Sequence, residues 1–171
     1  YKGTDLVGME YEQLIPWVKP VNVDENGNWE EAANQAFRVI LGDYVTTEDG
    51  TGIVHIAPTF GADDAFVARA AGIPSLFMIN KKGEPRPMVD LTGKFFLLDE
   101  LDEKFVKECV DVEQYQEYQG RWVKNAYDPQ FTVNGKYDEK TAASAETLDI
   151  YICMKMKASN KACLLYTSPS P

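Results

Sequence analysis

The stretch that decides the fold reads Thr51-Gly52-Ile53-Val54-His55-Ile56-Ala57-Pro58-Thr59-Phe60-Gly61-Ala62-Asp63-Asp64. Its first part is apolar around His55, the only histidine of the chain, and is typical of a short strand. Pro58 and Gly61 indicate a turn, and the pair Asp63-Asp64 opens a helix. A strand, a turn and a helix N-terminus can bring an imidazole, a carboxylate and free backbone N–H groups to one concavity. Such a site suits a small molecule that carries an ammonium group.

Outward from this stretch, short apolar runs alternate with turn residues. We expect strands at residues 21–23, 34–41, 52–57 and 76–79, turns at 24–28, 48–50 and 81–85, and helices at 63–71, 101–110 and 144–157. On the strand at 52–57, Ile53, His55 and Ala57 point to one side. The last helix carries Leu148, Tyr151, Ile152 and Met156 along one flank. Together these elements predict an α+β fold, a barrel-like mixed β domain with peripheral helices, followed by a helical connector.

Composition narrows the function classes. The 171 residues are 44% hydrophobic and contain no apolar run of membrane-spanning length, so no membrane partner is expected. Cys109, Cys153 and Cys163 lack metal or redox spacing, which favours a reduced, cytoplasmic setting and predicts no metal site. The net charge of −10 argues against the chain binding the phosphate backbone of a nucleic acid by itself. Lys81, Lys82 and Arg86 form a small basic cluster, either solvated turn residues or a phosphate contact.

Each candidate residue also has a structural interpretation. A lone histidine on an apolar strand is more often a buried, hydrogen-bonded residue than a functional one. Acidic residues in the first turn of a helix, such as Asp63 and Asp64, stabilise it by about 0.3–1 kcal/mol through the helix dipole. Residue patterns alone leave these alternatives open.

The same stretch carries a resemblance to a known family. Gly50-Thr51-Gly52-Ile53-Val54-His55, Ala57-Pro58, Gly61-Ala62-Asp63-Asp64 and Asp90-Leu91-Thr92-Gly93-Lys94-Phe95 resemble the editing domain of class I isoleucyl-tRNA synthetases. The resemblance extends through residue 162. It implies post-transfer editing, the hydrolysis of the ester that joins a mischarged valine to the 3′ end of tRNA(Ile). In this family a hydrophobic pocket separates isoleucine from valine by only about 1–3 kcal/mol, a known property of these enzymes, so a second sieve is needed.

The resemblance assigns catalytic and substrate-binding roles to two side chains. His55 matches the family's histidine that forms the pocket wall and excludes isoleucine. Asp64 matches the family's aspartate that binds the ammonium group of the substrate. Thr59 and Gly61 are expected to shape the substrate pocket through backbone groups. No Ser-His or Cys-His pair is evident, so a positioned water is the expected nucleophile.

The resemblance also implies a division of the chain. We expect a partial editing domain at residues 1–98, a connector returning toward the catalytic domain at 99–162, and a non-native, adapter-derived tail at 163–171. The family's threonine-rich strand is expected to lie before Tyr1, so the isolated chain is expected to be inactive. No cofactor is expected here, whereas ATP and magnesium would act at the separate synthetic site of the parent enzyme, which ligates isoleucine to tRNA(Ile). The expected partners are the mischarged 3′ end of tRNA(Ile) and the remainder of the synthetase.

Two alternatives remain at this point. One keeps the fold and changes the specificity to that of a valyl- or leucyl-type editing module. The other is a non-catalytic docking module with an acidic surface, which predicts that His55 and Asp64 lie far apart or face different directions.

Overall fold

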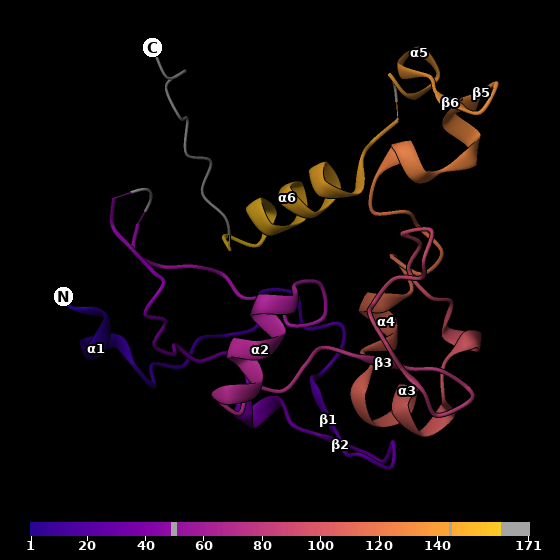
Figure 1. Cartoon of the computed structure of the whole chain (residues 1–171). Coiled ribbons are helices and arrows are strands. Elements are labelled where there is room, and N and C mark those ends of the chain that lie inside the picture. The colour runs from indigo at the N-terminus through magenta and orange to yellow at the C-terminus, as the bar shows by residue number, and fades with distance from the viewer. Residues whose placement is uncertain (49–50, 144, 162–171) are drawn as a thin grey trace. The chain divides into compact units, whose positions relative to one another are not determined.

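The computed structural model describes residues 1–48, 51–143 and 145–161, so the tail predicted at 163–171 and most of the turn predicted at 48–50 lie outside the described residues (Figure 1). The described residues form two compact units, one within residues 1–88 and 96–118 and one within residues 89–95 and 119–161. The first unit contains α1 (Gly3–Leu6), β1 (Val21–Val23), β2 (Trp29–Glu31), η1 (Ala33–Gln35), α2 (Ala62–Ala70), β3 (Met78–Ile79), β4 (Pro85–Arg86), η2 (Leu98–Glu100), α3 (Glu103–Cys109) and α4 (Val112–Tyr115). The second contains η3 (Asn125–Tyr127), η4 (Pro129–Phe131), β5 (Thr132–Val133), β6 (Lys136–Tyr137), α5 (Glu139–Ala142) and α6 (Leu148–Ala158).

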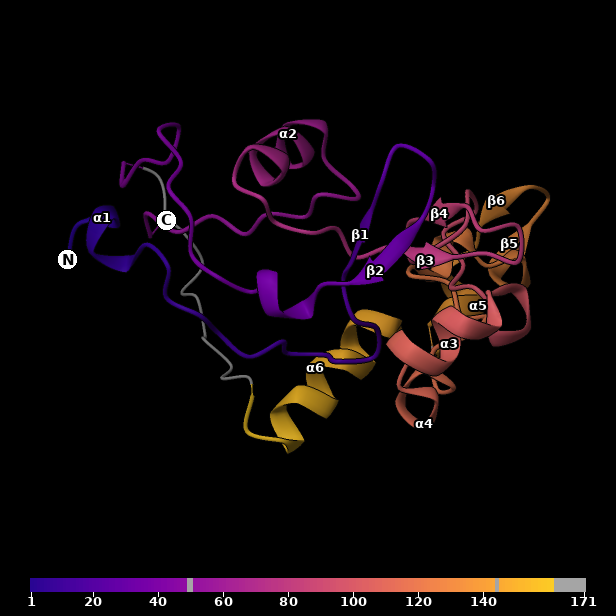
Figure 2. The same cartoon turned by 90° about the horizontal axis from the view of Figure 1, so that it is seen from below.

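The core of the first unit gathers around the β1–β2 hairpin and α3. The hairpin is antiparallel, with Val21 opposite Glu31, and its strands lie side by side in Figure 2. The Trp29 ring meets Phe105 of α3 edge-on at 5.5 Å between ring centroids, and Phe105 is fully buried. The ring of Trp17 stacks on that of Tyr118 at 3.7 Å. Large aromatic side chains therefore hold this unit together.

Three loops of the chain share one design. Each begins with Asp or Asn, whose side-chain oxygen accepts the N–H groups two and four residues later at 2.8–3.1 Å. Each has glycine at its fourth position with a positive φ, which L-residues adopt at a cost. The loops are residues 24–28, 80–84 and 90–94. The first two close the β1–β2 and β3–β4 hairpins, so the turns predicted at 24–28 and 81–85 are confirmed.

The helix after the deciding stretch is confirmed as α2, which begins and ends one residue earlier than predicted. Gly72 ends it with a φ of 66°, donating to the carbonyl of Arg69 while Ile73 donates to the carbonyl of Ala68. These two bonds form the usual glycine-terminated helix end.

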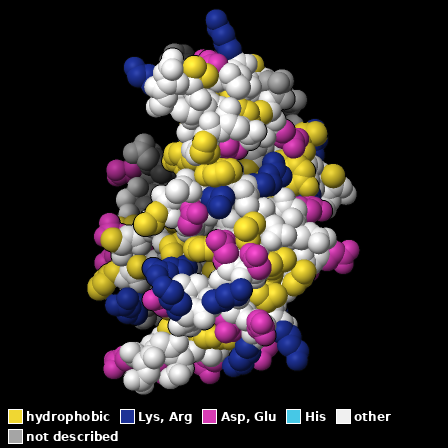
Figure 3. All heavy atoms as spheres, turned by 90° about the vertical axis from the view of Figure 1, so that its right-hand side faces the viewer, with side chains coloured by type: hydrophobic (Ala, Val, Ile, Leu, Met, Phe, Trp, Pro, Cys, Tyr) yellow, Lys and Arg dark blue, Asp and Glu magenta, His cyan; other side chains and the backbone are white. Residues whose placement is uncertain are grey.

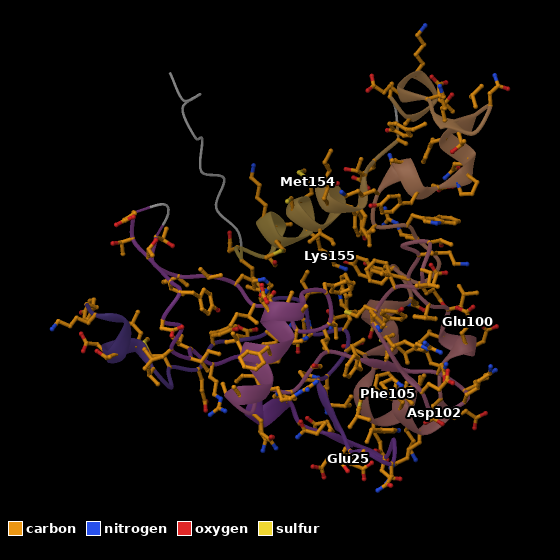
Figure 4. The ribbon with its side chains drawn as sticks, viewed as in Figure 1. Glu25, Glu100, Asp102, Phe105, Met154 and Lys155 are labelled. Atoms are coloured by element: carbon orange, nitrogen blue, oxygen red, sulfur yellow. The ribbon has the colours of Figure 1, made fainter. Side chains whose placement is uncertain are left out.

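The helix predicted at 101–110 is also confirmed, as α3. It begins after Asp102, whose carboxylate accepts the N–H of Phe105 at 2.8 Å (Figure 4). This side chain caps the first turn and fixes where the helix starts.

Two predicted strands are wrong. Residues 34–41 contain the end of η1 and then Phe37 at a φ of 52°, a left-handed conformation that interrupts a strand. Residues 52–57 form no strand because, within the described residues, no neighbouring strand pairs with them. The described strands form three separate two-stranded sheets and no closed barrel, so the α+β class holds and the barrel-like architecture is not confirmed.

The second unit has an unpredicted hairpin and a partly predicted helix. β5 and β6 are joined by Asn134-Gly135, both at positive φ, the typical pair for a two-residue hairpin turn. α6 begins after Thr147, which caps it, and not at residue 144 as predicted. The predicted flank of Leu148, Tyr151, Ile152 and Met156 is the less exposed side of α6, whereas Met154 and Lys155 are exposed (Figure 4). None of the described helices is long and apolar enough to span a membrane.

Candidate functional site

The candidate site is built at the start of α2. Gly61 is the residue that precedes the helix, with extended backbone, and Asp63 and Asp64 lie in the first turn. Their negative charges face the positive end of the helix dipole, which favours helix formation at this point. Asp63 is exposed and Asp64 is half-buried.

Asp64 reaches back over the preceding turn. Its Oδ2 atom accepts a hydrogen bond from the backbone N–H of Ala57 at 2.9 Å. Among the described residues, the other carboxylate oxygen has no hydrogen-bond partner. A carboxylate has lone pairs for several donors, so Asp64 can hold the loop and still accept a proton donor from a ligand.

The turn between Ala57 and Gly61 is closed by backbone bonds. Phe60 and Gly61 both donate to the carbonyl of Ala57, at 2.9 and 3.2 Å. A Cβ atom added at Gly61 would lie 3.0 Å from Cγ and Oδ2 of Asp64. Glycine at this position therefore lets the carboxylate lie close against the turn.

The sequence-predicted residues take up different places in this arrangement. Asp64, Thr59 and Gly61 are brought together by the bond to Ala57, with Thr59 half-buried in the turn. His55 lies two residues before Ala57 and is exposed. Two residues span at most about 7 Å, so the His55 backbone is held near the Asp64 loop.

The surroundings of His55 differ from the expected strand. Ile53 and Val54 are 71% and 52% exposed, so side chains on both sides of the backbone face outward. Phe60, next to the turn, is 64% exposed. The alternation predicted for Ile53, His55 and Ala57 is therefore wrong, because a buried face requires a partner layer that these residues lack within the described chain.

Other chemistry in the described residues is sparse. No three His, Cys, Asp or Glu side chains among them cluster in a way that could hold a metal ion. Cys109 is buried and Cys153 is exposed, and neither forms a disulfide.

One cluster was missed by the sequence reasoning. Residues 121–127 include two basic and two aromatic side chains. Three cations of the second unit lie over aromatic rings: Lys94 over Trp122, Arg121 over Tyr151 and Lys124 over Tyr127. The signal was present as Arg121-Trp122-Val123-Lys124-Asn125-Ala126-Tyr127, but it has neither helix nor strand periodicity.

Comparison with known proteins gives a consistent set of relatives. The chain is 77% identical over 162 residues to isoleucine–tRNA ligase of Bacteroides thetaiotaomicron, which covers 95% of the chain and 14% of that protein. It is 64% identical over 162 residues to the Bacteroides fragilis protein of the same name, 12% of its length. The Treponema denticola protein of this name is 37% identical over 150 residues, 88% of the chain and 11% of the relative. Neither a protein-family model nor a solved structure matches the chain.

The high identity and the near-complete coverage of the chain establish the family, while the chain spans only about one-seventh of the relatives' length. The chain belongs to the isoleucine–tRNA ligase family and corresponds to one segment of such an enzyme.

Proposed function

We propose that this segment supplies part of the editing site of an isoleucine–tRNA ligase, where valine is hydrolysed from mischarged tRNA(Ile). The observation that carries the proposal is the hydrogen bond from Ala57 to Asp64, which holds a carboxylate against the turn of residues 57–61. Family membership supports the choice of substrate.

Asp64 is proposed to bind the substrate ammonium through its unoccupied oxygen. A carboxylate–ammonium bond is stronger than a neutral one, and it distinguishes an aminoacyl group from other small apolar groups. His55 is proposed to be the wall that excludes isoleucine, and the backbone at Thr59 and Gly61 to shape the pocket.

The proposed reaction is ester hydrolysis by water. The water oxygen adds to the ester carbonyl, the bond from that carbon to the ribose oxygen breaks, and the ribose leaves as an alcohol that takes up the proton. Valine leaves as the free acid. Because an aminoacyl ester is already reactive, holding water and ester in place supplies much of the acceleration.

The rest of the activity is proposed to belong to other parts of the parent. Those parts would ligate isoleucine to tRNA(Ile), using ATP and magnesium, and would bind the body of the tRNA. The parent enzyme would act in the cytoplasm. The exposed Ile53, Val54 and Phe60 side chains support a site that is completed elsewhere. We therefore propose that the isolated chain has little or no editing activity.

The two alternatives to isoleucyl-type editing, a different editing specificity and a non-catalytic docking role, are disfavoured on separate grounds. A valyl- or leucyl-type editing module is disfavoured because the relatives are named isoleucine–tRNA ligases. A non-catalytic docking module predicted that His55 and Asp64 lie far apart or face different directions. The hydrogen bond from Ala57, two residues after His55, to Asp64 weighs against the first of these arrangements.

The test uses a full-length isoleucine–tRNA ligase that contains this segment. Asp64→Asn removes the charge while its amide oxygen can still accept the N–H of Ala57, so the loop is kept. We expect deacylation of valyl-tRNA(Ile) to slow by roughly 10- to 150-fold, the loss of a charged hydrogen bond worth about 1.5–3 kcal/mol.

The matched control is Asp63→Asn, which removes the same charge from the neighbouring exposed position. It should leave deacylation within about twofold of the wild-type rate. Equal losses in both variants, or none in Asp64→Asn, would refute the assignment of Asp64.

A further inference from the structure

The net charge of −10 is divided unequally between the two units. The first unit has nine Lys and Arg against 21 Asp and Glu, a net charge of −12. The second has eight Lys and Arg against six Asp and Glu, a net charge of +2. A net negative charge that disfavours binding to a phosphate backbone is therefore a property of the first unit and not of the second.

Within the second unit, basic side chains are clustered with aromatic rings. The Nζ atoms of Lys94 and Lys124 lie 5.7 and 5.9 Å from the ring centroids of Trp122 and Tyr127. The guanidinium of Arg121 lies 4.7 Å from the ring of Tyr151.

The backbone holds these groups in one place. Lys94 and Trp122 are bridged in antiparallel fashion, and Val123 donates to the carbonyl of Gly93 at 2.9 Å. The Tyr127 ring packs so closely on Gly93 that an added Cβ would lie 2.7 Å from its Cδ2 atom. The cluster is thus set by packing of residues 90–95 against 121–127.

The cations are not neutralised by ion pairs. Among the described residues, no carboxylate lies within 4.0 Å of Lys94, Arg121 or Lys124. Two carboxylates interact with these lysines at longer range, Asp90 with Lys94 and Asp149 with Lys124, and Asp90 also accepts hydrogen bonds from the backbone of Thr92 and Lys94. With no carboxylate within ion-pair distance, the three cations can still bind an anionic ligand such as a phosphate.

We infer that Lys94, Arg121, Trp122, Lys124 and Tyr127, hereafter the cation–aromatic cluster, bind an RNA strand. The cations contact phosphates, and the exposed part of the Tyr127 side chain, which is 49% exposed, contacts an unstacked base. Interleaved cations and rings fit this ligand better than an acidic peptide, which has no bases to stack. That the strand belongs to tRNA rests on the proposed function, whereas the surface itself does not involve His55 or Asp64.

The experiment measures binding of a tRNA(Ile) transcript to the full chain over a range of salt concentrations. The test variant is Lys94→Gln with Lys124→Gln. The matched control is Lys81→Gln with Lys82→Gln, which removes two charges from exposed turn residues of the other unit. We expect the test variant to bind about tenfold more weakly and to lower the slope of log K against log salt by about 1.4–1.8, which corresponds to two lost phosphate contacts.

Three further arms make the result decisive. Lys94→Arg with Lys124→Arg should restore binding because both charges return, which excludes a folding defect as the cause. A poly-glutamate competitor should displace the RNA poorly. Tyr127→Leu should weaken binding of single-stranded RNA several-fold.

Equal weakening in the test and control variants, or failure of the arginine rescue, would overturn the inference. So would equally effective competition by poly-glutamate, which would indicate an acidic protein ligand. The transcript is not aminoacylated and carries no ammonium for Asp64 to bind, so the binding result is independent of the editing proposal.

Discussion

At the scale of single residues, the candidate site depends on one carboxylate with two uses. Asp64 accepts the N–H of Ala57 and keeps one oxygen available at the start of α2. The sequence predicted the helix, since acidic residues are typical of a first turn, whereas the role of Asp64 comes from the family resemblance and stays a prediction. The bond to Ala57 could not be predicted, because it depends on the path of the turn between them.

Cys109 provides a residue-scale prediction on pH. Burial, and secondarily the charge of Glu31, raises the pKa of its thiol from an ordinary 9.0 to about 11. The unfolded chain therefore loses this proton near pH 9 while the folded chain keeps it, so the folded state is favoured below pH 9 and loses stability as the pH rises to 11.

Urea unfolding at pH 8, 9, 10 and 11 measures this effect. The fall in unfolding free energy between pH 9 and 11 should be smaller in Cys109→Ala than in the wild type, although the variant is less stable at every pH. Parallel curves for the two proteins would contradict a buried, protonated thiol.

At the scale of elements, three loops with glycine at the fourth position fix the hairpins and the packing of residues 90–95. Gly27 has a φ of 82° with open space around it, whereas Gly93 has a φ of 81° and faces the Tyr127 ring. Gly3 has open space and no positive φ. Alanine substitutions at these three positions therefore distinguish the cost of a left-handed backbone from the cost of steric overlap with a neighbouring side chain.

The alanine variants should rank accordingly in chemical unfolding. Gly27→Ala should cost about 1–2 kcal/mol because of the left-handed backbone, and Gly93→Ala more because the ring must also move. Gly3→Ala, the control, should be neutral or slightly stabilising, since it lies in helix α1. Similar losses at Gly27 and Gly3 would contradict the loop design.

Local signals explain which elements were predictable from sequence. α2, α3 and the turns at 24–28 and 81–85 are set by caps, glycines and Asp or Asn side chains that act within five residues. The strand at 52–57 failed because apolar composition cannot say whether a partner strand is present. Phe37 likewise takes a left-handed conformation that its residue type does not suggest.

At the scale of the whole molecule, several large hydrophobic side chains of the described residues are exposed. Hydrophobic side chains lie between acidic and basic ones on the face shown in Figure 3. Phe66 of α2 and Ile53 near His55 are 75% and 71% exposed. Because the chain spans 14% or less of its relatives, we expect the parent enzyme to cover part of this surface and to complete the site.

The most direct measurement of the central claim compares two esters in the full-length parent. One is valyl-tRNA(Ile), and the other carries 2-hydroxyisovalerate, which has the same side chain but no ammonium. If Asp64 binds the ammonium, Asp64→Asn slows hydrolysis of the valyl ester by roughly 10- to 150-fold and leaves the hydroxy ester within about twofold. Equal slowing of both esters would contradict the account, because Asp64 would then act only by holding the Ala57 loop.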